Sequence, residues 1–199
     1  MKNELKIVTA VGVAVALAGC ASTTVVDPGL TSYTEVNDAM SAMAANYIDV
    51  DGNPLGGLDT SATSWANVPA NGSGASATYN GFVGGDVTGG GLDGNTLVGE
   101  LELAANFDNE TISGSADNFY DDGNAQYTGT LTLSGSIATG FDPMITANLA
   151  GDLSNGGTDY ATTIGLDGWF IGETGPDAVG GYADGTVDGG AFVGVFVAD

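Results

Sequence analysis

The strongest constraint on the fold of this chain is a two-residue alternation of apolar and polar side chains, which is clearest at residues 97–107 and 127–137. Within 97–107 every second residue is apolar or glycine, and most of the residues between them are polar. Successive side chains of a β-strand point to opposite faces, so the alternation predicts strands with one buried face. Glycine-rich turn signals separate these segments. We expect eight strands, at about 77–84, 97–107, 111–119, 127–137, 144–153, 161–172, 178–187 and 190–198.

An open sheet of eight strands would leave two unpaired edges, which closure into a barrel removes. Glycines lie within the predicted strands, as in small barrels that fill their interior with alternating small and large side chains. A transmembrane barrel needs an apolar outer face. The outward positions here hold polar residues, namely Glu100, Glu102, Asn106, Thr130 and Asn148. We therefore predict an all-β fold: an eight-stranded antiparallel soluble β-barrel over 78–199, preceded by a small helix-containing segment.

That preceding segment, residues 34–77, contains one predicted helix. Ser32 and Glu35 fit a capping box, and Val36 begins an apolar stripe at helical spacing that predicts a helix over about 33–47. The sequence 49–53 resembles a calcium loop, but Pro54 occupies the position of the turn glycine and Thr60 that of the bidentate glutamate. We predict a turn here and no metal site.

The N-terminus has the features of a lipoprotein leader. Two lysines, Lys2 and Lys6, precede an apolar run over 7–18 that ends in the sequence Leu-Ala-Gly-Cys at Cys20. This run is shorter than a membrane-spanning helix, and the four residues Leu17–Cys20 resemble a lipobox. The pattern predicts a signal peptide at 1–19, lipidation of Cys20 and a lipidated tether at 20–33. The protein would then be anchored to a membrane through its lipid.

The charge of the chain excludes several classes of function. Removal of the leader takes away both lysines and Glu4, leaving 24 of the 25 acidic residues, no arginine and no histidine. Such a chain repels nucleic acid and lacks the general base of Ser-His-Asp catalysis. We predict no enzyme activity and no cofactor. We also expect crowding of like charges to raise the carboxylate pKa values.

The C-terminal third is similar to a known family. The stretch 168–182, with its Gly-Trp-Phe-Ile-Gly strand, turn and paired glycines before Tyr182, resembles the barrel lobes of transferrin-binding-protein-B-like surface lipoproteins. Residues 190–196 are similar to the closing strand of that family, and the resemblance covers about 78–199. It implies a protein of the outer membrane, lipid-anchored and surface-exposed, with a barrel beside a smaller handle.

The resemblance also implies a non-catalytic binding protein for an extracellular protein or an iron- or haem-related ligand. A lipocalin-like carrier of a small ligand and a structural envelope lipoprotein are the alternatives. The contents of the barrel interior distinguish a protein that binds on its outer surface from a carrier, because a carrier needs a cavity of a few hundred Å³. The side chains expected to fill the interior are Leu101, Leu103, Phe107, Leu131 and Leu133.

Overall fold

The computed structural model describes residues 29–60, 75–138, 144–172 and 175–199. The predicted signal peptide and the lipidation site at Cys20 lie outside these residues. A helix, α1 (Tyr33–Tyr47), precedes the strands. The strands are β1 (Ser76–Thr88), β2 (Thr96–Asn106), β3 (Thr111–Asp121), β4 (Gln126–Tyr127), β5 (Leu131–Ala138), β6 (Met144–Asn155), β7 (Thr158–Ile171), β8 (Ala178–Val187) and β9 (Gly190–Ala198), with a 3-10 turn at Gly90–Leu92.

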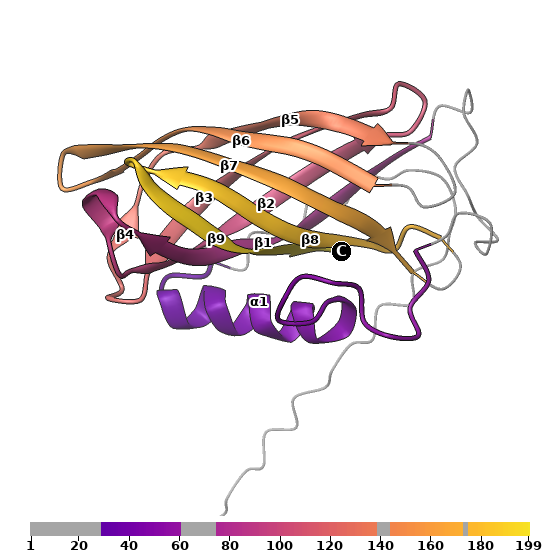
Figure 1. Ribbon diagram of the computed structural model, residues 1–199, viewed down its shortest axis with the longest axis horizontal. Coiled ribbons are helices and arrows are strands. Elements are labelled where there is room, and N and C mark those ends of the chain that lie inside the picture. The colour runs from indigo at the N-terminus through magenta and orange to yellow at the C-terminus, as the bar shows by residue number, and fades with distance from the viewer. Residues whose placement is uncertain (1–28, 61–74, 139–143, 173–174) are drawn as a thin grey trace, which may run out of the picture.

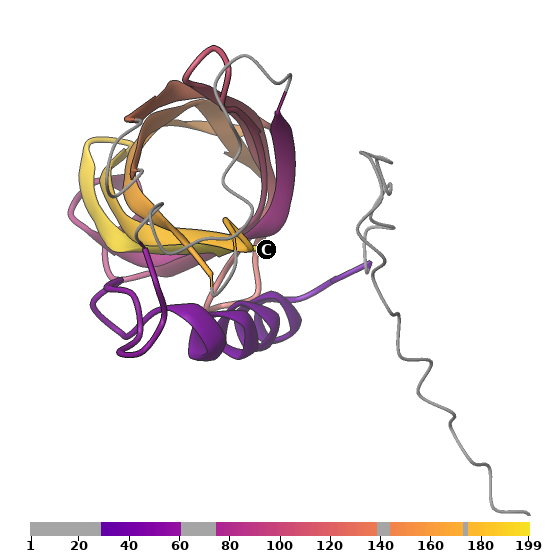
Figure 2. The same ribbon diagram turned by 90° about the vertical axis from the view of Figure 1, so that its right-hand side faces the viewer.

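The strands form a closed antiparallel barrel. β5, β6, β7, β8 and β9 pair in chain order, β9 pairs with β1, and β1, β2 and β3 follow in turn. The circle closes where β3 pairs with β5. The two-residue strand β4 pairs with one end of β3 as an extra element. Figures 1 and 2 show the barrel from the side and along its axis, with α1 outside it. The predicted all-β, eight-stranded antiparallel barrel with a preceding helix is confirmed.

One predicted strand is wrong as a single element. The segment 127–137 is divided into β4 and β5, with Gly129 between them at a φ of +113°. This backbone conformation favours glycine and interrupts the strand. A Cβ atom at Gly129 would also lie 2.3 Å from the carbonyl oxygen of Asp152. The bounds predicted for β8 and β9 agree with the structure.

The barrel interior is filled by apolar side chains. Leu101, Leu103, Phe107, Leu131 and Leu133 all belong to its core and are at most 7% exposed. Four phenylalanine rings are fully buried: Phe119, Phe170, Phe192 and Phe196. Phe107 packs against Phe170 with ring centroids 5.2 Å apart. The interior is therefore a packed core.

Room for these rings comes from glycines on other strands. Phe119 of β3 lies against Gly99 of β2, and a Cβ there would come within 2.6 Å of the ring. Phe192 of β9 lies against Gly85 of β1 in the same way, at 2.8 Å. A small residue opposite a ring lets it pack on bare backbone. The alternation of small and large residues thus operates between strands as well as along them.

The helix packs on the outer wall of the barrel. Ser32 caps it, its Oγ accepting a hydrogen bond from the Glu35 amide at 3.3 Å. The Glu35 carboxylate accepts from the Thr31 amide, one residue before the partner expected in a capping box. Val36 and Met40 are buried in a second core, formed with side chains from the outside of the barrel. Those side chains are Phe82, Val98, Tyr120, Ile171 and Val197.

The position of the helix explains why Val98 is 2% exposed on a face that the alternation marks as mostly polar.

Among the described residues, no helix combines the length and the apolar character needed to cross a membrane.

Replacing Gly99 with alanine tests the packing of rings on glycine. The new methyl group would overlap the Phe119 ring, and overpacking of this kind costs about 1–3 kcal/mol. The matched control is Gly165→Ala on β7, where the nearest atom to a Cβ is 3.4 Å away. Urea unfolding should show a clear loss for Gly99→Ala and a change within about 0.5 kcal/mol for Gly165→Ala. Equal unfolding free energies for the two variants would contradict this packing.

Candidate functional site

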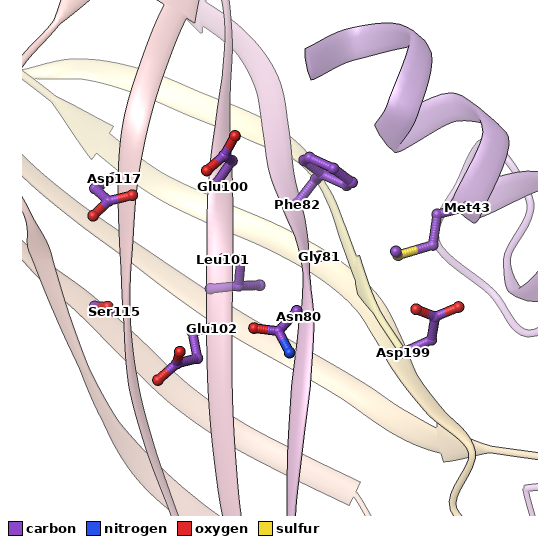
Figure 3. A pocket seen from close by; sticks show the side chains of 10 residues that line it. All are labelled: Met43, Asn80, Gly81, Phe82, Glu100, Leu101, Glu102, Ser115, Asp117 and Asp199. Carbon is purple, nitrogen blue, oxygen red and sulfur yellow. The ribbon is translucent and has the colours of Figure 1, made fainter. Parts of the chain in front are cut away.

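The helix and the outer wall enclose two hollows, one of them rich in acidic residues. This acidic groove has a volume of about 410 Å³ and is formed by α1, β1, β2 and β3. Figure 3 shows the side chains that line it. We define it by Met43, Phe82, Glu100, Glu102, Asp117 and Asp199. Carboxylates thus surround a thioether and a phenyl ring.

A β-bulge brings two of these carboxylates together. The register of β2 on β3 shifts between Val98 and Glu100, and Asn118 takes a φ of +51°. A bulge places two residues opposite one and re-aims their side chains. As a result Asp117 is the direct cross-strand partner of Glu100, and Figure 3 shows the two on neighbouring strands. Two negative charges in this position repel each other.

An amide group donates a hydrogen bond to the Glu100 carboxylate. The side-chain nitrogen of Asn118 donates to Glu100 Oε1 at 3.1 Å and to the carbonyl oxygen of Leu30 at 3.0 Å. Gln126 in turn donates to the Asn118 side-chain oxygen at 3.1 Å. This network ties the acidic groove to the residues just before the helix.

A tyrosine hydroxyl connects the helix to the acidic wall. Tyr47 donates to Asp199 Oδ2 at 3.3 Å, and burial, followed by the charge of Asp199, raises the pKa of this tyrosine. At the other end of the helix, burial and the charges of Asp122 and Asp86 raise the pKa of Tyr33. Both phenols therefore remain protonated over a wide pH range, and Tyr47 stays a hydrogen-bond donor.

A second hollow, the apolar groove, is also bounded by the helix. It has a volume of about 540 Å³ and lies against α1, β1, β2, β9 and the loop after the helix. We define it by Met40, Ala44, Ile48, Val50, Val98 and Val195. Asp49, Asn37 and Thr96 add polar atoms to its lining. Sequence reasoning missed both grooves.

The loop after the helix contains the predicted turn. Asp49 Oδ1 accepts hydrogen bonds from the amides of Asp51 and Asn53, each at 2.9 Å. The Asn53 amide makes the largest contribution to a pKa of Asp49 below its ordinary value. The Thr31 amide does the same for Glu35. The expectation that crowding raises carboxylate pKa values is therefore wrong for these two groups, because amide donors favour their charged form.

One buried acid has a structural function. Asp121 is 6% exposed and accepts hydrogen bonds from the Tyr127 hydroxyl at 2.9 Å and the Ala125 amide at 2.8 Å. These bonds close the turn between β3 and β4. Burial, followed by the Asp121 hydrogen bond, raises the pKa of Tyr127.

In the described part of the chain, no group of three or more acidic, histidine or cysteine residues is arranged to hold a metal ion.

The grooves supply acceptors, negative charge and apolar contact area, which suit recognition of cationic and amphipathic groups.

The chain matches no protein-family model, and comparisons with curated proteins and with solved structures found no significant match.

Replacing Asp117 with asparagine tests the repulsion across the bulge. The variant should raise the free energy of unfolding by about 0.5 kcal/mol at low salt, because a like-charge pair is removed. In 1 M NaCl the gain should largely disappear, since the Debye length there is about 3 Å. The control is Asp152→Asn, whose cross-strand partner on β7 is Ala161. Equal gains for both variants in denaturant titrations would assign the effect to overall charge.

Proposed function

We propose that this chain is a lipid-anchored, non-catalytic binding protein of the outer-membrane surface, and that an extracellular protein docks on the outer wall of its barrel beside α1. The observation that carries the proposal is the contrast between the two sides of the wall. The inside is filled by Phe119, Phe170, Phe192 and Phe196, whereas both grooves lie on the outside. This contrast favours binding on the outer wall over a lipocalin-like carrier that holds its ligand within.

The polar side chains on the outer wall support a barrel that is surrounded by water. Glu102, Thr130 and Asn148 are exposed there, as are many threonines and serines. The anchor rests on the lipobox-like sequence ending at Cys20, twelve residues before the helix cap Ser32. A tether of that length reaches at most about 40 Å when extended, so the barrel would remain close to the membrane. The negative charge would keep the barrel off an anionic lipid surface.

The lipid anchor predicts a specific loss in one variant. Cys20→Ser should abolish incorporation of radiolabelled palmitate and leave the leader uncleaved, because the thiol that receives the lipid is gone. Gel autoradiography of cells expressing each form measures both effects. Cell fractionation should place the wild-type chain in the outer membrane, and protease added to intact cells should degrade it. Palmitate labelling that survives the substitution would contradict the anchor.

The docking surface predicts where a bound partner can be cross-linked. A photoreactive phenylalanine analogue placed at Met43 or Val50, one in each groove, should capture a partner from the natural surroundings of the cell. The same analogue at Thr132, exposed on the outside of β5, serves as the control. Capture at 43 or 50 together with none at 132 is expected. Equal capture at all three positions would show that the outer wall near the helix is not a preferred surface.

A further inference from the structure

The apolar groove has a floor and walls that expose little polar surface. Met40 and Ile48 from the helix side face Val98 and Val195 from the strands. A Cβ atom at Gly84 would lie 2.9 Å from the Met40 sulfur, so the thioether sits directly on bare strand backbone. The groove is thus shaped to receive apolar side chains.

Exposed hydrophobic side chains gather at this groove. Among the described residues the exposed large hydrophobics are Val50 at 93%, Val193 at 67% and Tyr182 at 37%. Val50 lines the groove itself. Tyr182 is the cross-strand partner of Val195 in the groove wall, and Val193 lies two residues before Val195 on the same face of β9. Apolar side chains clustered in this way mark an interaction surface.

Acidic residues border the same surface. Val193 has Asp184 of β8 on one side and Asp86 of β1 on the other, as direct cross-strand partners. Asp49 lines the groove from the loop after the helix. The two lysines of the whole sequence, at positions 2 and 6, precede the predicted mature start, so no side-chain cation of the mature chain can neutralise this border.

We propose that the apolar groove binds a cationic amphipathic segment of the protein partner, with apolar side chains in the groove and basic side chains at Asp49, Asp86 and Asp184. This inference rests on the proposed function and names the chemistry of the partner. Charge complementarity selects this occupant, because a second copy of the acidic chain would be repelled and a neutral segment would leave the acidic border unpaired. An amphipathic helix presents its anchors at positions i, i+3, i+4 and i+7, which suits a groove that runs beside α1.

Three synthetic peptides test the proposal on the full chain. All three share one leucine stripe at helical spacing. The remaining positions are lysine in the first peptide, glutamine in the second and glutamate in the third. Isothermal titration in 50 mM NaCl should give the tightest binding for the lysine peptide, at least ten-fold weaker binding for the glutamine peptide and none for the glutamate peptide. Binding of the lysine peptide should weaken in 500 mM NaCl, because salt screens the border charges.

Paired variants locate the site. The double variant Val50→Ser with Val193→Ser removes exposed apolar side chains. The double variant Asp86→Asn with Asp184→Asn removes two border charges. The asparagine at position 86 keeps a side-chain oxygen that can accept the hydrogen bond from the Thr96 hydroxyl. Each pair should weaken binding of the lysine peptide at least five-fold. The matched controls, Thr132→Ser and Asp152→Asn, change exposed residues of β5 and β6 and should leave binding unchanged.

Each other result overturns the proposal. Equal losses in groove and control variants would mean unspecific attraction to an acidic protein. Glutamine and lysine peptides that bind equally well would remove the cationic requirement. Self-association of the chain that Val50→Ser abolishes would make a second copy the occupant. If cross-linking at position 50, in the apolar groove, captures a partner without a basic amphipathic segment, the proposed function stands and this inference alone fails.

Discussion

The structure depends on filling a closed barrel whose interior has room for few large side chains. Leucine, isoleucine and phenylalanine side chains fill the core, and several of the rings lie against a glycine on another strand. Gly99 for Phe119 and Gly85 for Phe192 are two such positions, since a Cβ there would come within 3 Å of the ring. Close packing of this kind leaves the interior without spare volume. The packed interior therefore differs from the hollow interior that a carrier of a small ligand needs.

The outer wall carries many carboxylates, and neutral groups donate to them where lysine or arginine would in another protein. Thr96 donates to Asp86, Thr146 to Asp167 and Tyr47 to Asp199. A hydroxyl or amide donor occupies a lone pair of the carboxylate but leaves its charge in place. The helix can therefore pack near this wall without cancelling the field around it. The negative field around the wall therefore remains able to attract cationic groups.

Local patterns in the sequence predicted most of the barrel, and nonlocal contacts account for what they missed. The alternation located the strands, and the capping residue with its apolar stripe gave the helix bounds found in the structure. The break at Gly129 depends on a positive φ that composition does not reveal. The outer core under α1 does have a sequence signal, because apolar doublets such as Leu97-Val98 and Phe119-Tyr120 interrupt the alternation. Those doublets mark strands buried on both faces, but they do not say which element covers them, so the grooves beside the helix could not be located.

The grooves exist because the helix covers only a narrow stripe of the barrel. Val36 and Met40 are its buried residues, while Met43 and Ala44 are only partly covered at its flanks. A short helix gains most of its stability from packing, and the packing of α1 centres on two buried side chains, Val36 and Met40. A partner seated in either groove would bury more of these flanks and would stabilise the docked helix by its own binding free energy. Helix docking and partner binding are then linked, and each strengthens the other by the same factor. In the described part of the chain, a partner bound in either groove would thus act on the packed barrel through α1, the helix outside its wall.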